Sequence, residues 1–201
     1  MPQRDSYHHG NLPQVLIREG AALLAERGVD RFSMREVARR AGVAVAAPSH
    51  HFGNAKGLLT AIAADGFARL AQRQAKAAAA NPDPRDQVIA MCRAYIDLCV
   101  EEPGPALVMF RLELVDGSDP QFQDRAVHSF EQFSRAVAHA SPPSADRSQI
   151  DQIAKSLWSM MHGLQALRMI TDDEAEGLIR FAVSAFLAEP RSARDGQAEQ
   201  R

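Results

Sequence analysis

The chain has 201 residues, of which 46% are hydrophobic and 24% charged, and its formal net charge is −2 at pH 7. This length fits one ordinary domain or two small ones, and the balance of apolar and charged residues excludes disordered, collagen-like and mucin-like classes for most of the chain. The longest stretch without a charge, residues 42–55, is shorter than the roughly 20 apolar residues of a membrane span. Since residues 1–10 show no secretory signal either, we expect a cytoplasmic protein that does not bind membranes.

Charge is distributed unevenly along the chain. Residues 1–60 carry three more Lys and Arg than Asp and Glu, whereas residues 61–201 carry five fewer. A basic segment joined to an acidic body indicates a polyanion-binding module attached to a second part.

The two cysteines, Cys92 and Cys99, are predicted to be reduced core residues. Seven positions correspond to about 10.5 Å of rise along a helix. This exceeds the Cα separation of about 7 Å that a disulfide allows. The pair also lacks the C-x-x-C spacing of a redox or zinc site.

Apolar residues recur with helical spacing almost everywhere, and no segment alternates as a strand would. The sequence therefore predicts an all-α fold of about nine helices. The expected helices span residues 11–27, 33–41, 45–51, 55–79, 85–102, 106–115, 119–140, 146–170 and 172–188.

Start and stop signals set several of these boundaries. Gly28 and Gly42 offer the left-handed residue that ends a helix. Ser33 and Glu36 fit a capping box, in which the Glu carboxylate reaches back to the N-cap. Pro48 lies in the first turn of its helix, where the loss of an N–H matters least.

Residues 33–52 carry the most specific pattern, a capped helix, a glycine turn and a second short helix. This is the arrangement of a helix-turn-helix, whose second helix enters the major groove of DNA. Ser33 and Arg35, at the start of the first helix, are placed to hold phosphates. The alternative is a tight corner in an ordinary helical bundle, and the basic charge around the segment favours DNA binding.

The run from Ser33 to Val43, followed by His-His-Phe-Gly-Asn at 50–54 and Gly-Leu-Leu at 57–59, resembles the DNA-binding domain of the tetracycline-repressor (TetR) family of transcriptional regulators. The segments 7–12 and 46–48 resemble a branch of that family whose C-terminal domain carries a Trp, His and Gly motif. Trp158, His162 and Gly163 stand in that arrangement here.

The resemblance implies an Ω-shaped homodimer that reads a palindromic operator, usually as a repressor released by a small-molecule effector. It implies a helix-turn-helix DNA-binding domain over residues 11–71 and a ligand-binding and dimerisation domain over 72–188. Residues 189–201 are polar and charged and are expected to form a disordered tail.

The expected DNA-binding residues combine the recognition helix that the resemblance implies with the basic residues around it: Arg4, Ser33, Arg35, Val45, Ala46, Ser49, His50, His51 and Lys56. Two positions depart from the family pattern. Ser49 stands where a Tyr is common, and Ala55 where a Lys is common, with Lys56 one position later. Both usual residues contact the DNA backbone, so their loss is expected to weaken binding and its salt dependence unless Lys56 substitutes.

The last two expected helices carry more apolar surface than one core face needs. Two such helices form a four-helix interface with a second copy, and two-fold pairing also matches the symmetry of a palindromic operator. We therefore expect a homodimer through these helices, with Leu157 in the interface. The alternative is that both helices are buried within the monomer.

An effector pocket is expected in the C-terminal part, because Met and aromatic side chains there suit an adaptable apolar cavity. The candidate ligand-binding residues are Met91, Tyr95, Met109, Phe110, Phe133, Trp158, Met161 and His162. For each residue taken singly, ordinary core filling is at least as good an explanation. For His162 the core or interface role is favoured over ligand binding.

Two other functional classes compete with a regulator. An enzyme is disfavoured, since no G-x-S-x-G, P-loop, H-E-x-x-H or Rossmann motif is present, and we expect no cofactor. The adjacent pairs His8–His9 and His50–His51 lack the i, i+4 spacing of a helical metal site. A helical adaptor without specific DNA binding is the second rival, and salt-sensitive retention on DNA distinguishes both rivals from a regulator.

Overall fold

The chain is described by a computed structural model in which residues 11–167 and 172–188 are placed. Arg4 and the expected tail at 189–201 lie outside the described residues. Every regular element within the described residues is a helix, as the sequence predicted. These elements are α1 (Leu12–Arg27), the short 3-10 helix η2 (Val29–Arg31), α2 (Met34–Arg40), α3 (Ala47–Phe52), α4 (Ala55–Ala79), α5 (Pro84–Glu101), α6 (Pro103–Met109), α7 (Pro120–Ala140), α8 (Arg147–Leu167) and α9 (Asp172–Phe186).

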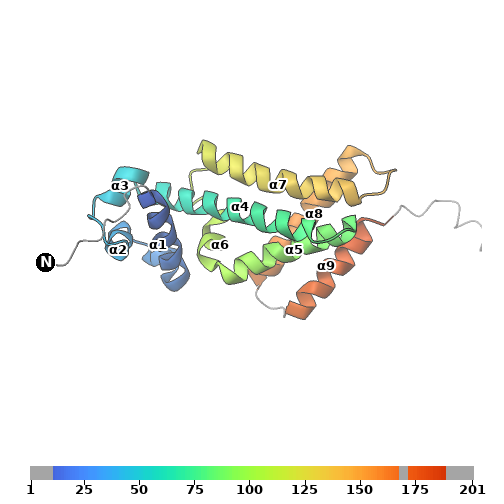
Figure 1. Cartoon of the computed structure of the whole chain (residues 1–201), viewed down its shortest axis with the longest axis horizontal. Helices are drawn as coiled ribbons and strands as arrows, with labels where there is room; N and C mark the ends of the chain where they lie inside the picture. Colours follow the sequence, from blue (N-terminus) through green and yellow to red (C-terminus); the bar gives the residue numbers. More distant parts are fainter. Residues whose placement is uncertain (1–10, 168–171, 189–201) are drawn as a thin grey trace, which may run out of the picture. The chain divides into compact units, whose positions relative to one another are not determined.

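The helices form two compact units (Figure 1). The described part of unit 1 comprises residues 11–71 and 97–129, and that of unit 2 comprises residues 72–96 and 130–188 without 168–171. The helices α4, α5 and α7 each contribute residues to both units. Among the described residues no helix is long and apolar enough to cross a bilayer.

Unit 1 is built around α1, which packs against α2, α3 and α6. Leu16, Leu23 and Leu24 of α1 are fully buried together with Leu58 and Ile62 of α4. Glycine is required where α6 approaches α1, because a Cβ on Gly104 would collide with the backbone carbonyl of Ala21. This close packing ties residues 97–129 to the helix-turn-helix segment.

Unit 2 has a core of aromatic, sulfur-containing and aliphatic side chains. Tyr95, Phe133 and Leu157 are fully buried. Cys92 is also buried, and this burial raises the pKa of its thiol. Both cysteines are free, in agreement with the expected reduced core residues.

Two expectations about helix boundaries need correction. The helix expected to begin at Val45 begins at Ala47, because Ala44 to Ala46 form a turn in which the Ala47 N–H donates to the Ala44 carbonyl at 2.9 Å. The helix expected at 106–115 spans Pro103–Met109 instead. Proline fits the first turn of a helix, where its missing N–H has no intrahelical partner in any case.

The predicted capping box is also wrong in part. Ser33 is the N-cap of α2, but its side chain makes no cap hydrogen bond. The Glu36 carboxylate does not reach back to it, because the guanidinium groups of Arg39 and Arg40 bind that carboxylate instead. The charge-assisted hydrogen bonds from arginine outcompete a neutral backbone N–H.

The position of Leu157 differs from the expected interface. Its side chain is 0% exposed within the single chain, so it belongs to the core of unit 2 and leaves nothing for a partner to cover. The apolar surplus of the last two helices lies elsewhere, on α9. There Phe181 is 73% exposed, and Leu178 and Phe186 are exposed as well.

Candidate functional site

The turn between α2 and α3 is fixed by backbone hydrogen bonds. Gly42 adopts a φ of 69°, which lets the chain reverse after Ala41. The Val43 N–H donates to the Ala38 carbonyl at 3.0 Å and the Gly42 N–H to the Arg39 carbonyl at 3.3 Å. This pair of bonds is a Schellman motif, which satisfies the last carbonyls of α2 and fixes the direction of the chain that enters α3.

The expected base-reading residues lie on the exposed surface of this segment. Ser49, His50 and His51 are exposed on α3, and Ala46 and Val45 are exposed in the turn before it, with Val45 at 60%. The imidazole rings of His50 and His51 meet edge to face with centroids 5.4 Å apart. Pro48, on the opposite side, is buried. The short side chains and the two imidazoles therefore form an exposed surface, while the buried Pro48 packs α3 against the rest of unit 1.

An ion-pair network joins α1 and α2. Arg40 binds Glu26 of α1 at 2.6 Å between Nη2 and Oε2, and Arg39 binds Glu36 at 2.7 Å. The Arg39 hydrogen bond is the main cause that lowers the pKa of Glu36 to about 2. Arg27 also reaches Glu36, at 3.7 Å. The network holds α1 and α2 together and neutralises the charge of Arg39 and Arg40.

Two cations within residues 33–56 remain available for phosphates. Arg35 and Lys56 are both exposed, and among the described residues neither forms an ion pair. Both had been predicted to bind DNA, and so had Ser33, whose half-buried hydroxyl is not used in the cap. Within residues 33–56 the two cations without an ion pair are thus ones that the sequence predicts to contact DNA, and that role stays a prediction.

The start of α4 includes two residues that the sequence prediction missed. Asn54 accepts a hydrogen bond on Oδ1 from the Gly57 N–H at 3.0 Å and so caps the helix. A Cβ on Gly57 would collide with the backbone carbonyl of Phe52, so only glycine allows α3 to end this close to α4. The available signal was the glycine itself, which is unusual in the first turn of a long helix.

The candidate ligand-binding residues divide between the two units. Tyr95, Phe133, Trp158 and His162 come together in unit 2. The Trp158 ring lies 5.6 Å from the Tyr95 ring and 5.7 Å from the Phe133 ring, measured between centroids. The Tyr95 hydroxyl lies 3.1 Å from His162 Nδ1. Met91 and Met161 are buried in the same unit.

Met109 and Phe110 belong to unit 1. The Phe110 ring packs edge to face on Phe67, with centroids 5.3 Å apart, and Met109 packs against Gly66 of α4. The sequence offered no signal that this part of the chain joins the DNA-binding segment, because the contacts link residues far apart in the chain.

A buried amide in unit 2 was also missed. Gln74 of α4 is fully buried, and its Nε2 donates to the Met91 carbonyl at 3.4 Å. Among the described residues its Oε1 has no hydrogen-bond partner. A buried polar atom without a partner is costly, so this oxygen marks a polar point in an otherwise apolar core.

The geometry of unit 1 defines a helix-turn-helix whose second helix is exposed and whose Arg35 and Lys56 form no ion pair with a described residue, and the comparisons with known proteins agree. Residues 16–62 match the family described as bacterial regulatory proteins, tetR family. Residues 88–173 match a tetracyclin repressor-like C-terminal domain, and this match includes Trp158, His162 and Gly163. The chain belongs to the TetR family and is a DNA-binding transcriptional regulator, not an enzyme.

Solved structures show the same fold over nearly the whole chain. A protein of unknown function from Rhodococcus sp. RHA1 is 27% identical with a TM-score of 0.77, and the alignment covers 92% of this chain and 100% of that one. The TetR family transcriptional regulator PfmR from Thermus thermophilus is 18% identical with a TM-score of 0.65, covering 89% and 96%. A bacterial regulatory protein in the tetR family from Rhodococcus RHA1 is 16% identical with a TM-score of 0.67, covering 90% and 100%. No curated protein matches the chain.

Proposed function

We propose that the protein is a repressor that binds a palindromic operator as a homodimer and is released by a small-molecule effector. The observation that carries the proposal is the exposed face of α3 together with the exposed Arg35 and Lys56, which form no ion pair with a described residue, while Arg39 and Arg40 are paired internally. Phosphate contacts fix the position of a helix on the duplex, and side chains of the recognition helix read the base edges. The proposed location is the cytoplasm, where such a regulator meets its DNA.

In this proposal residues 11–71 bind DNA, and residues 72–188 bind the effector and the second copy. Part of the second segment is held against the first within unit 1. The Asp116 N–H donates to the Thr60 hydroxyl at 2.8 Å, and Arg69 of α4 binds Glu102. Because α5 and α7 run without a break from unit 2 into unit 1, a shift of either helix reaches the DNA-binding segment through these contacts.

The proposed dimer forms through α8 and α9, and the exposed apolar residues of α9 support it. A Phe that is 73% exposed, as Phe181 is, gains most from a partner surface. Phe181→Arg is expected to shift the sedimentation coefficient from that of a dimer to that of a monomer. Its far-UV circular dichroism should stay unchanged, because Phe181 contributes little to the monomer core. A dimer that persists in this variant places the interface elsewhere.

The operator is tested by selecting random duplex DNA on the purified protein at near-physiological salt and sequencing the bound pool. An enriched palindrome is the expected result, and an unenriched pool contradicts the proposal. On the enriched sequence, His50→Ala should abolish specific binding while the dimer remains. His139→Ala, at an exposed position of α7, is the matched control and should bind like the parent protein.

A further inference from the structure

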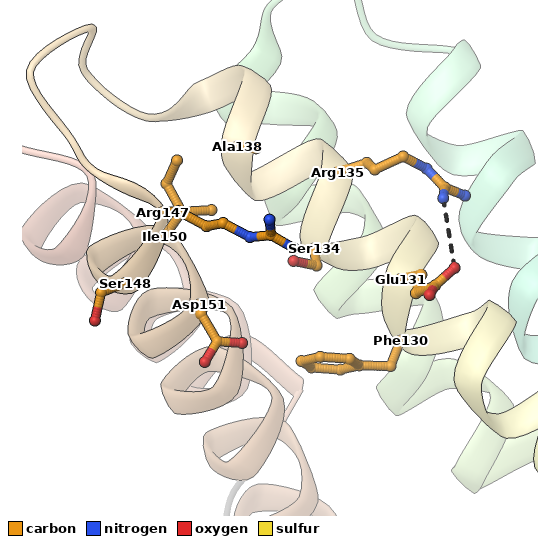
Figure 2. A pocket seen from close by; sticks show the side chains of 9 residues that line it. All are labelled: Phe130, Glu131, Ser134, Arg135, Ala138, Arg147, Ser148, Ile150 and Asp151. Atoms are coloured by element: carbon orange, nitrogen blue, oxygen red, sulfur yellow. Dashed lines mark ion pairs between the residues drawn. The ribbon is translucent and has the colours of Figure 1, made fainter.

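A second candidate site lies on unit 2, where α7 and α8 border an open groove of about 1010 Å³ (Figure 2). This volume is large enough for a drug-sized molecule. Its lining residues are Phe130, Glu131, Ser134, Arg135, Ala138, Arg147, Ser148, Ile150 and Asp151.

The charged residues of the groove leave one positive charge unmatched. Glu131 pairs with Arg135 at 3.8 Å, and Asp151 pairs with Lys155 at 2.6 Å. Arg147 forms no ion pair with any described residue. In Figure 2 its side chain points from α8 towards α7, on the side of Ser134. The groove is therefore lined by a guanidinium without an ion pair among the described residues and by the Ser134 hydroxyl, and both groups suit an anionic ligand.

The apolar part of the groove leads to the aromatic cluster of unit 2. Phe130 points from α7 towards α8, and its ring meets the Trp158 ring edge to face with centroids 5.5 Å apart. Trp158 in turn packs on Tyr95, whose hydroxyl lies 3.1 Å from His162 Nδ1. A molecule that moves Phe130 therefore disturbs the environment of Trp158, which is the only tryptophan in the sequence.

We propose that this groove binds a small molecule with a carboxylate head and a short apolar tail. Arg147 and Ser134 bind the carboxylate, Phe130 and Ile150 cover the tail, and Trp158 senses occupancy through the Phe130 ring. The proposal that the groove binds such a molecule does not depend on the proposed repressor function. Its role as the effector site rests on the proposed function.

The head-group chemistry is tested with three probes that share an eight-carbon chain: octanoate, octan-1-ol and octylammonium. Binding to the full chain is measured by calorimetry and by Trp158 fluorescence, since none of the probes absorbs where indole is excited. Octanoate is expected to bind about tenfold more tightly than octan-1-ol, as a charge-assisted hydrogen bond implies, and octylammonium most weakly. Equal affinity for octanoate and octan-1-ol would show that the groove does not recognise the carboxylate charge. Tighter binding of octylammonium would show that the groove prefers a cation, and either result overturns the proposal.

Two variants locate the probe. Arg147→Gln should weaken octanoate binding about tenfold and leave octan-1-ol binding unchanged. Lys76→Gln removes an exposed cation of α4 outside the groove and should change neither. Phe130→Leu keeps an apolar side chain but loses the ring contact, so it should retain affinity within about threefold while the fluorescence change shrinks. Unchanged octanoate affinity in Arg147→Gln, with an intact circular dichroism spectrum, places the ligand elsewhere and overturns the proposal.

The effector role is measured separately, on the selected operator with and without octanoate. A lower operator affinity with octanoate, absent in Arg147→Gln, supports it. Octanoate binding that leaves operator affinity unchanged overturns the effector role but not the site. If no operator is enriched at all, the proposed repressor function fails, and the calorimetric result still decides the groove.

Discussion

The helix-turn-helix segment and the aromatic cluster of unit 2 are held together by different means. In the first, the Schellman turn at Gly42 joins residues at most five positions apart, and the ion pairs of Glu36 and Glu26 join residues at most 14 positions apart in α1 and α2. In the second, the Tyr95 hydroxyl meets a histidine that lies 67 positions away, and Trp158 packs between rings of α5 and α7.

This difference determines how strongly a single substitution destabilises each region. A local turn depends on backbone geometry, so a single methyl group in the wrong place is costly. A cluster of rings spreads its stability over many weak contacts, so loss of one polar atom is a small perturbation. The helix-turn-helix should therefore be sensitive to shape and charge, and the cluster tolerant of single deletions.

The largest effect is expected for Gly57→Ala. The added Cβ would collide with the Phe52 carbonyl, a backbone atom that cannot rotate away, so the free energy of unfolding should fall by about 3 kcal/mol. Gly177→Ala is the matched control in α9, where a Cβ would meet nothing of the same chain within 4 Å. With both glycine variants made in the monomeric Phe181→Arg background, Gly177→Ala should stabilise by about 0.5–1 kcal/mol. Urea denaturation measures the change in unfolding free energy of both variants. An equal change at the two glycines would contradict the expectation that the helix-turn-helix is more sensitive to an added methyl group.

The next effect concerns paired and unpaired arginines. Arg35→Gln removes a free cation, so the slope of log K against log salt for operator binding should become shallower by about 0.9. Arg39→Gln removes a cation that Glu36 already neutralises and should change the slope by less than half as much. Fluorescence anisotropy over a salt series gives both slopes. Equal slopes in the two variants would show that internal pairing does not decide which arginines meet phosphate.

A smaller effect is expected for Tyr95→Phe. The substitution keeps the ring that packs on Trp158 and removes the hydroxyl near His162, so the free energy of unfolding should drop by about 1 kcal/mol. Urea denaturation followed by Trp158 fluorescence measures it. Operator affinity without ligand should stay as in the parent protein. A loss of several kcal/mol would mean that the hydrogen bond, and not the packing of rings, holds the cluster.

The two regions also differ in how far the sequence could predict them. Gly42 ends α2 as expected, because the need for a left-handed residue is a local property. The start of α3 was misplaced by two residues, since the turn at Ala44 has no glycine or proline to mark it. The capping box failed for an electrostatic reason, as Arg39 and Arg40 lie within reach of Glu36.

For the aromatic cluster of unit 2, the sequence indicated several of the residues that take part but not which of them contact one another. Trp158, Tyr95 and His162 do meet, whereas Met109 and Phe110 pack in unit 1. Leu157 lies on one apolar stripe of α8 with Ala154 and Met161, and only the packing of unit 2 shows that this stripe is buried within the single chain. The sequence could not predict the groove, because the groove forms only where α7 and α8 pack side by side. Arg147 stands out only after the ion pairs of the other charged residues near the groove are known.

The smallest effect is the pH dependence that Glu36 contributes to folding. Its pKa is lowered to about 2 from an ordinary value of 4.5, mainly by the Arg39 hydrogen bond. A carboxylate with a lowered pKa in the folded state stabilises fully above its unfolded pKa, and this stabilisation is lost as the pH falls from about 4.5 to about 2. The difference in unfolding free energy between the parent protein and Glu36→Gln should therefore shrink over that range, as followed by urea denaturation at each pH. Arg39→Gln should narrow the range from its acid end, because the Glu36 carboxyl then takes up its proton at a higher pH. If the difference in unfolding free energy between the parent protein and Glu36→Gln stays constant with pH, Glu36 acts through packing and not through its charge. The helix-turn-helix would then not differ from the aromatic cluster in its dependence on charge.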